Sequence, residues 1–273
     1  MRAQLLRKIY GELEHLSRRM TYGFRAERPG SPRGICNICG CEVAFEDVEP
    51  SSPRESFRCP LCNSTSRNRF LVYTLGLVLG FKEEPLAMLG KERSVRIFEA
   101  SGVARYCSYL ARTFDYINAQ YDPGVLKKRT FDRRKYADLQ SLHYPDRSFD
   151  VVIASDVLEH VRLYEAALKE VCRVLDTDGV FLLQIPYDHS MEKTVTRVET
   201  RGDEDHHLLP PVYHGGRTLV YRDYGRDLLD AMRGVGFTTI YFERELAQLG
   251  VPRQGVIIGA RNPNFDLASM LDF

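Results

Sequence analysis

The sequence predicts an α/β fold with a doubly wound, mostly parallel sheet, preceded by a small cysteine-rich module. From residue 94 onward, short runs typical of β-strands alternate with helical stretches, which is the pattern of repeated strand–helix–strand units. The 273 residues, of which 44% are hydrophobic and 27% charged, suit one large domain with a small appendage. This composition excludes disordered and collagen-like proteins.

Charge and hydropathy exclude two further classes. Lys and Arg together number 38 and Asp and Glu 37, so the net charge of +1 gives no general argument for a nucleic-acid or acidic membrane partner. The longest apolar run, residues 70–81, is shorter than the roughly 18 residues that cross a bilayer. We therefore expect no membrane span, no secretory signal and a cytoplasmic protein.

Residues 1–35 are predicted to form a helix followed by a linker. Residues 22–35 are rich in Gly, Pro, Ser and Arg, which is typical of a linker. A helix that packs on the protein is favoured over one that lies on a membrane. It is indicated by four apolar residues at helical spacing: Leu5, Ile9, Leu13 and Leu16.

Residues 36–66 are predicted to form a zinc-binding module. Two Cys-x2-Cys pairs, separated by 19 residues, have the spacing that closes one tetrahedral zinc site. Four thiolates leave no position for water, so we expect the zinc to be structural. Buried or redox-active cysteines are the alternative, and Cys41 is an alternative ligand to Cys39. The predicted ligands are Cys36, Cys39, Cys59 and Cys62.

A helix within residues 67–91 is predicted to connect this module to the α/β domain. Gly76 and Gly80 weaken that prediction because glycine disfavours helix interiors. Further helices are expected over residues 103–113, 162–175 and 224–235, and Gly179 is expected to stop the second of these. The expected strands are residues 94–100, 116–122, 149–157, 180–186, 237–243 and 254–261.

Polar residues follow two of the expected strands. The first strand ends at Glu99 and is followed by small residues, Ser101 and Gly102, that permit close approach of a ligand to the backbone. With one glycine where a dinucleotide fingerprint has three, this turn alone is no more than a generic strand-to-helix connection. The segment Phe149–Val161, FDVVIASDVLEHV, carries further polar side chains at the tip of its strand.

Three phrases resemble the class I S-adenosylmethionine-dependent methyltransferases of the methyltransferase-11 type. They are SFDVVIASDVLEHV, EVCRVLDTDGVFLLQIP and GVGF, which look like the fourth and fifth strand regions and a late turn of that family. The resemblance covers about residues 92–262. The phrases CPLCNSTSRNRFL, HHLLPPVYHGG and YRDYGRDLLDAMRGVGF also resemble a bacterial subgroup in which a cysteine-rich module precedes enzymes of glycan or small-molecule modification.

The resemblance implies a seven-stranded Rossmann-like methyltransferase sheet within residues 92–273. It also implies S-adenosylmethionine at the carboxyl ends of the strands, where open α/β sheets bind their ligands. Asp138 would lie near the adenine, whereas Gln120 stands where the family has an acid for the ribose hydroxyls. The residues placed around the cofactor are Glu99, Ser101, Gly102, Gln120, Asp138, Leu139, Ser155 and Asp156.

A hydroxyl acceptor would need a general base. Candidates are His160, His206 and His214, of which the last two fall with Asp205 and His207 in an insertion around residues 187–220. An insertion of this length beside the active edge of the sheet is predicted to act as a substrate lid. Metal binding by these histidines and a solvated polar loop are the alternatives.

The function expected from the resemblance is methyl transfer from S-adenosylmethionine to an O or N atom of a small-molecule or glycan-type acceptor. A second interpretation makes RNA the acceptor and the zinc module its clamp, but acidic neighbours balance the basic runs. A third is a non-catalytic zinc-binding interaction protein with a degenerate methyltransferase fold. The sequence indicates no oligomeric state.

Overall fold

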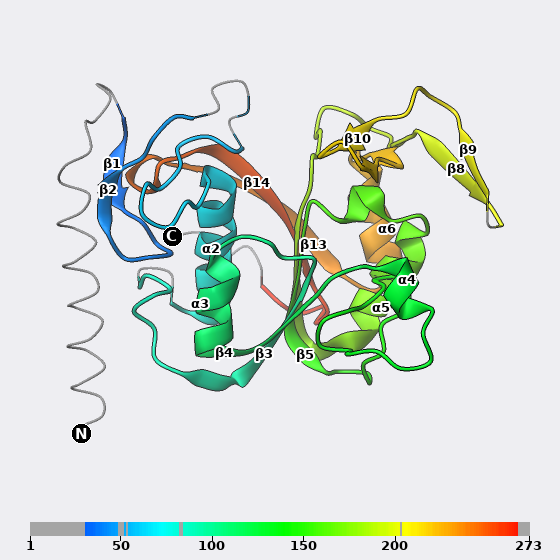
Figure 1. Cartoon of the computed structure of the whole chain (residues 1–273), viewed down its shortest axis with the longest axis horizontal. Helices are drawn as coiled ribbons and strands as arrows, with labels where there is room; N and C mark the ends of the chain where they lie inside the picture. The colour runs from blue at the N-terminus through cyan, green and yellow to red at the C-terminus, as the bar shows by residue number, and fades with distance from the viewer. Residues whose placement is uncertain (1–30, 49–51, 53, 82–83, 203, 267–273) are drawn as a thin grey trace. The chain divides into compact units, whose positions relative to one another are not determined.

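The computed structural model describes residues 31–48, 52, 54–81, 84–202 and 204–266 (Figure 1). The predicted amino-terminal helix lies outside these residues. The chain divides into two compact units. Unit 1 contains the described residues up to Glu92 with Val103–Thr113 and Glu243–Gly255, and unit 2 contains Arg93–Gly102, Phe114–Phe242 and the described residues from Val256 onward.

Unit 1 is built from a cysteine-rich hairpin and two helices. Strands β1 (Arg33–Ile35) and β2 (Glu42–Ala44) pair antiparallel. Helix α2 (Ser66–Leu79) begins at a capping box, in which the Thr65 side chain accepts a hydrogen bond from the Asn68 backbone and the reverse bond is also made. Helix α3 (Tyr106–Thr113) also belongs to this unit.

Helix α2 ends at Gly80, whose φ of 80° places it in the left-handed region. A residue without a Cβ adopts this conformation at little cost. Gly76, by contrast, is buried within the helix. The two glycines that weakened the sequence prediction therefore have different roles, one as the helix stop and one as part of the helix interior.

A six-stranded mixed sheet carries the α/β part of the chain. Strand β5 is parallel to both β3 and β6, whereas β14 is antiparallel to β6. The strands thus form a Rossmann-like, mostly parallel α/β sheet, as predicted. The order across the sheet is β13 (Thr238–Leu246), β14 (Val251–Ala260), β6 (Leu175–Gln184), β5 (Phe149–Ser155), β3 (Glu92–Ala100) and β4 (Phe114–Ala119).

The predicted seventh strand is not confirmed among the described residues. Beside the end of β4, Gln120 and Tyr136 form one isolated parallel bridge. The Gln120 N–H donates to the Lys135 carbonyl at 2.7 Å, and the Ala137 N–H donates to the Gln120 carbonyl at 3.1 Å. The pairing ends there because the chain turns back on itself at Asp138, which bridges antiparallel to Ser141.

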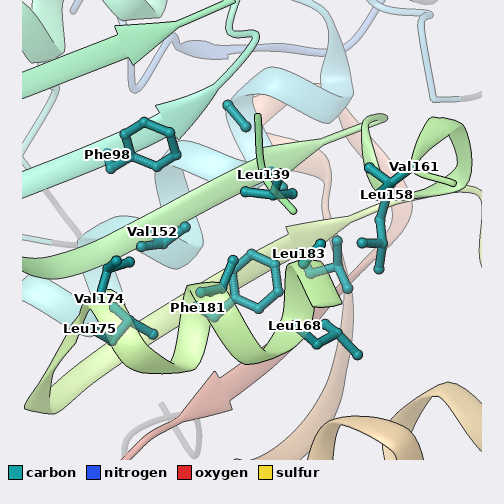
Figure 2. Close-up of a cluster of buried hydrophobic side chains, with 14 of the residues drawn as sticks. Phe98, Leu139, Val152, Leu158, Val161, Leu168, Val174, Leu175, Phe181 and Leu183 are labelled. Carbon is teal, nitrogen blue, oxygen red and sulfur yellow. The ribbon is translucent and has the colours of Figure 1, made fainter. Parts of the chain in front are cut away.

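The main core of unit 2 lies between one face of this sheet and helices α5 (Tyr164–Val174) and α6 (Asp227–Gly234) (Figure 2). Leu168 of α5 is fully buried, as are Val152 of β5 and Phe181 of β6. Burying each such large apolar side chain stabilises the fold by about 1.5–3 kcal/mol. This packing fixes the strands whose carboxyl ends carry the candidate site.

The predicted helix stop at Gly179 is wrong. Helix α5 ends at Val174 and β6 begins at the next residue, so Gly179 lies within the strand. The pairing of β5 with β6 shifts register just before Val151. A Cβ at Gly179 would lie 2.9 Å from the Asp176 backbone nitrogen, so glycine is needed because the chain folds tightly against itself there.

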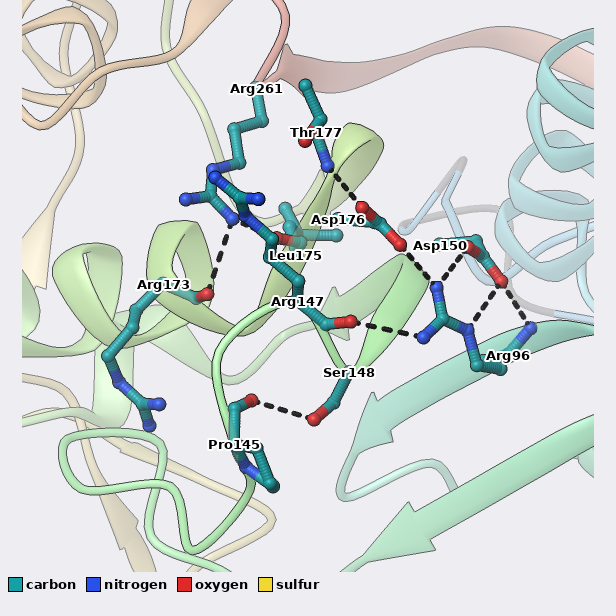
Figure 3. Close-up of polar contacts among 10 residues, drawn as sticks. All are labelled: Arg96, Pro145, Arg147, Ser148, Asp150, Arg173, Leu175, Asp176, Thr177 and Arg261. Atoms are coloured by element: carbon teal, nitrogen blue, oxygen red, sulfur yellow. Dashed lines mark hydrogen bonds and ion pairs between the residues drawn. The ribbon is translucent and has the colours of Figure 1, made fainter.

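Polar contacts join the amino ends of the parallel strands (Figure 3). Arg96 of β3 contacts Asp150 of β5 at 2.7 Å and Asp176 of β6 at 2.6 Å. Its backbone N–H also donates to Asp150 at 2.7 Å. One guanidinium thus links three strands at the end of the sheet opposite the candidate site.

The insertion after β6 consists of short antiparallel pairs (Figure 1). Its role as a lid stays a prediction. None of the described helices has the length and apolar character that crossing a bilayer requires. The pairs are β8 (Val198–Arg201) with β9 (Glu204–His207), β10 (Tyr213–His214) with β11 (Thr218–Leu219), and β7 (Val195–Thr196) with β12 (Arg222–Asp223).

Candidate functional site

The four predicted zinc ligands come together in unit 1. The Sγ atoms of Cys36 and Cys62 are 3.7 Å apart, and those of Cys39 and Cys59 are 3.8 Å apart. All four sulfurs lie within 4.8 Å of one another, and every side chain is buried. Sulfurs about 2.3 Å from a tetrahedral zinc are about 3.8 Å apart, which is the separation of these two pairs.

The thiol pKa values of this cluster diverge. Burial raises the pKa of Cys36, but hydrogen bonds from the other three thiols bring it well below its usual value. The hydrogen bond with Cys36 is the main cause that raises the pKa of Cys39 and of Cys59. The metal-binding form of cysteine is the thiolate, so a cation that binds here displaces the remaining thiol protons.

A buried arginine lies beside the thiols. Arg69 of α2 is 0% exposed, and its Nε donates to the Leu249 carbonyl at 2.6 Å. Its two Nη atoms donate to the carbonyls of Ser64 (2.5 Å), Gly250 (3.0 Å) and Phe57. Burial lowers the pKa of Arg69, and the cysteines oppose that effect. The guanidinium therefore places a positive charge where four thiolates would concentrate negative charge.

In unit 2, the turn after β3 is held by side chains of β4. Glu99 is fully buried and accepts a hydrogen bond from the Tyr116 hydroxyl at 2.5 Å. A Cβ on Gly102 would lie 2.5 Å from the Glu99 carboxyl carbon, so any other residue would displace this buried carboxylate. The Asn118 amide accepts from the Gly102 N–H at 3.0 Å and donates to its carbonyl at 2.6 Å. Side chains of β3 and β4 therefore hold this turn, which has one glycine.

The predicted ribose and adenine residues follow β4. The Gln120 amide donates to the Gly102 carbonyl at 3.4 Å, so it lies beside the turn. Asp138 accepts hydrogen bonds from the backbone and side chain of Gln140 at 2.9 and 3.0 Å. Leu139 is 6% exposed and packs in the hydrophobic core. Their roles toward a cofactor stay predictions.

The ends of β3 and β5 share an uncommon backbone conformation. Ser101 has a φ of 56° and Asp156 a φ of 52°, values that non-glycine residues adopt at a cost. The Asp156 N–H donates to the Gln184 carbonyl at 2.7 Å, and the Ser155 hydroxyl donates to the Gln184 side chain at 3.3 Å. Backbone strain of this kind is common at functional sites. Here it lies at the carboxyl ends of β3 and β5, where the connections between strands change direction along the sheet.

Directly after β5, the short helix η1 (Leu158–His160) carries two groups of a second cluster. His160 Nδ1 lies 2.8 Å from the Leu219 carbonyl, so this nitrogen carries the proton and Nε2 is an acceptor. His214 Nδ1 lies 3.2 Å from that Nε2. The carboxylate of Glu159, 2% exposed, lies 3.8 Å from His160 and 3.7 Å from His214.

The structure brings together two of the three predicted catalytic histidines. His206 lies on β9, and its Nε2 is 3.7 Å from Glu204, outside the Glu159 cluster. Its neighbour Asp205 binds Arg162 at 2.9 Å and accepts from the Tyr221 hydroxyl at 2.7 Å. The Arg162 contact ties the insertion to the segment that follows His160, and the Tyr221 contact ties it to the residues that follow the insertion.

Three residues of the site had escaped the sequence predictions of site residues: Tyr116, Asn118 and Glu159. A signal for the first two was present, because Tyr116 and Asn118 alternate with the buried Ile117 and Ala119 on β4. Alternation on a strand places them on one face. Glu159 could not be paired with His214 from sequence, since 55 residues separate them.

Comparisons with known proteins agree with the fold. Residues 100–183 match the family model described as a methyltransferase domain. No curated protein matches the chain. The matched segment runs from the end of β3 to β6, so it contains the turn at Gly102 and the polar end of β5.

Several solved structures are similar. An S-adenosylmethionine-dependent methyltransferase from Mesorhizobium loti is 18% identical with a TM-score of 0.42, covering 64% of this chain and 94% of its own. YcgJ from Bacillus subtilis is 14% identical with a TM-score of 0.41, covering 69% and 99%. A Haloferax volcanii complex of the Trm112 activator and a methyltransferase is 12% identical with a TM-score of 0.42, covering 73% and 95%.

Proposed function

We propose that this protein transfers a methyl group from S-adenosylmethionine to an O or N atom of a small-molecule or glycan-type acceptor. The observation that carries the proposal is the match of residues 100–183 to the methyltransferase-domain model, because this segment holds the polar ends of β3 and β5. Ligands of open α/β sheets bind at this edge, where the direction of the chain connections reverses.

The residues at this edge suit the proposed cofactor. The Asn118 side chain holds the turn at Gly102, and the Gln120 amide beside it can bond ribose hydroxyls. Asp138 would accept from the adenine amino group, and Ser155 and Asp156 would face the methionine end. When bound, the sulfonium supplies an activated methyl group, so the protein mainly aligns the acceptor and excludes water.

The surface of the insertion supports a small or glycan-type acceptor rather than RNA. Five large apolar side chains are exposed among its described residues: Val195, Leu208, Leu209, Val212 and Tyr213. The basic run after α4 (Pro123–Leu126) is partly neutralised, because Arg134 contacts Asp115 at 3.3 Å and Lys135 contacts Asp132 at 3.4 Å. An RNA-binding surface needs Lys and Arg side chains whose charge is available to the phosphates.

We also propose that the four-cysteine cluster holds a structural zinc ion. The sulfur spacing of 3.7 and 3.8 Å and the buried Arg69 support this role. Four thiolates complete a tetrahedral site and leave no position for a substrate or water. The zinc would therefore stabilise unit 1 and take no part in methyl transfer.

The first experiment is calorimetric titration of the zinc-loaded protein with S-adenosylmethionine and S-adenosylhomocysteine. We expect micromolar binding, weakened at least tenfold by Asp138→Ala and strengthened by Gln120→Glu, which adds a charge-assisted hydrogen bond to the ribose. Asp146→Ala is the matched control, because that exposed carboxylate contacts Arg173 away from this edge.

Three results would reject the proposal or part of it. No binding of either compound at millimolar concentration would favour the non-catalytic interaction protein. Equal affinity in the Asp138→Ala protein would remove that residue from the site. Salt-dependent RNA binding that disappears with the zinc would favour RNA as the acceptor.

A further inference from the structure

We propose that Glu159, His160 and His214 bind one divalent first-row metal ion at the carboxyl end of β5. Their ligand atoms, a carboxylate oxygen and two imidazole nitrogens, lie within 4.8 Å of one another. This site is separate from the four-cysteine cluster, and all three of its residues belong to unit 2. The proposal goes beyond methyl transfer, because metal binding needs neither the cofactor nor the acceptor.

The distances fit ligands that surround one ion. His160 Nε2 is 3.2 Å from His214 Nδ1, and the Glu159 oxygen is 3.7 and 3.8 Å from these nitrogens. Ligands about 2.1 Å from an ion lie about 3.0–3.4 Å apart, depending on its geometry. The two carboxylate distances exceed a hydrogen bond, so small movements toward a shared ion would replace long contacts with coordination bonds.

One hairpin both supplies a ligand and orients another. Strand β10 carries His214, and its partner β11 carries Leu219, whose carbonyl lies 2.8 Å from His160 Nδ1. A metal-binding histidine usually donates its second ring N–H to a carbonyl or carboxylate, which leaves the other nitrogen free for the metal. Tyr221, two residues further on, donates its backbone N–H to the Glu159 carbonyl at 2.8 Å.

The donor set selects a class of metal. Two imidazoles and one carboxylate suit Mn²⁺, Fe²⁺ or Zn²⁺, whereas the four thiolates of unit 1 select zinc. Three protein ligands leave coordination positions open. The His214 side chain is 43% exposed, so solvent reaches the cluster from that side.

The open positions give the metal a role if the proposed methyl transfer is correct. The cluster follows Ser155 and Asp156, the residues proposed to face the methionine end of the cofactor. A metal at this place would bind an acceptor oxygen and lower its pKa, as metals do for bound water. This role of the metal, unlike metal binding itself, rests on the proposed function.

Manganese is the probe that separates the two clusters, because it prefers nitrogen and oxygen ligands to thiolates. The full-length protein, loaded with one equivalent of zinc, is titrated with Mn²⁺ by calorimetry and by the loss of the free-ion electron paramagnetic resonance signal. We expect one Mn²⁺ site. His214→Ala, His160→Ala and Glu159→Gln should each weaken it by about 100-fold or more, since even outer-shell changes weaken metal sites tenfold to 100-fold.

His206→Ala is the matched control for His214→Ala. Both imidazoles lie on the insertion, with side chains 42% and 43% exposed, but His206 lies outside the cluster. We expect His206→Ala to keep the Mn²⁺ affinity. If His160→Ala fails to fold by circular dichroism, His214→Ala decides, because its side chain lies on a short, exposed hairpin.

The proposal is overturned if the wild-type protein binds no Mn²⁺ at millimolar concentration, or if His214→Ala binds it as tightly as wild type. Loss of the site in His206→Ala would overturn the assigned ligand set. Titration of His214→Ala with S-adenosylmethionine separates the proposed metal site from the proposed methyltransferase function, because it measures cofactor binding without the metal site. Mn²⁺ binding without cofactor binding would leave the metal site standing and reject the methyltransferase function.

Discussion

The four-cysteine cluster of unit 1 and the Glu159–His160–His214 cluster of unit 2 differ in how completely they enclose a metal position. The four cysteines of unit 1 are at most 4% exposed and surround one position completely. In unit 2, Glu159 is equally buried, but the His214 side chain is 43% exposed, and the cluster offers three ligands rather than four. A saturated, buried cluster can only hold structure together, whereas an unsaturated one leaves room for a reacting molecule.

The clusters also differ in what holds their residues. The cysteines lie in two tight turns, in which the Gly40 N–H donates to the Cys36 carbonyl and the Asn63 N–H to the Cys59 carbonyl, both at 2.8 Å. The two histidines, by contrast, are held together by the β10–β11 hairpin, which is distant from η1 in sequence. We therefore expect substitutions in the first cluster to change stability, and those in the second to change metal binding with little effect on stability.

The largest effect is expected from Cys59→Ser or from zinc removal by a chelator. Structural zinc sites contribute about 10–16 kcal/mol of binding free energy, so losing one ligand should lower the stability of unit 1 by more than about 5 kcal/mol. Metal analysis and differential scanning calorimetry would measure this. Cys41→Ser is the control, since Cys41 is as buried but lies outside the four-sulfur cluster. Full zinc content in the Cys59→Ser protein would contradict the prediction.

Arg69→Met should have the next largest effect. The change removes the Arg69 donors from four backbone carbonyls, of which Ser64 keeps the Cys59 N–H, and removes the positive charge beside the thiolates; it should cost about 3–5 kcal/mol in urea unfolding. Arg67→Met provides the comparison, because the ion pair of Arg67 with Glu55 lies nearer the surface and should contribute about 1 kcal/mol or less. Similar losses in the two variants would show that Arg69 has no special role.

His214→Ala should reduce the free energy of unfolding by about 1 kcal/mol or less, the contribution of one exposed hydrogen bond. The same urea titration used for Arg69→Met would measure it. A loss above about 3 kcal/mol would mean that the second cluster is also structural, and the contrast between the clusters would fail.

Asp205→Asn should give the smallest change, about 0.5 kcal/mol at neutral pH. Burial raises the pKa of Asp205, but hydrogen bonds from Tyr221 and Arg162 outweigh that effect and lower it below its usual value. A carboxylate with a lowered folded pKa stabilises the fold above its unfolded pKa of about 3.8, and this contribution is lost as the pH falls through the lower folded value. The difference in the free energy of unfolding between Asp205→Asn and wild type should therefore shrink in acid. A difference that grows as the pH falls would contradict the lowered pKa of Asp205.

The sequence predicted the four-cysteine cluster well because its geometry is local. Each Cys-x2-Cys pair forms within one turn, so spacing alone fixes which sulfurs meet. The polar ends of the strands were also predictable, since parallel strands align their carboxyl ends whatever the details of packing. Sequence reasoning failed at Gly179, which was predicted to stop a helix. This glycine lies inside β6, near a shift in the register between β5 and β6.

The histidine cluster could not be predicted in full. In sequence, His206 and His214 are equivalent polar residues of one insertion. They are separated by tertiary structure, because the β10–β11 hairpin places His214 against His160 while β9 places His206 beside Glu204. Periodicity and spacing carry no information on how a hairpin packs against a segment more than fifty residues earlier.

The bonds of Arg69 set an order on the synthesis of the chain. Its carbonyl partners at Leu249 and Gly250 lie 180 and 181 residues downstream. The cysteine module leaves the ribosome about 180 residues before these partners do. A nascent chain can gather its zinc ligands while the partners of Arg69 are still unmade, so this arginine stays incompletely bonded over that interval. Unit 1 therefore matures only after much of unit 2 has been synthesised.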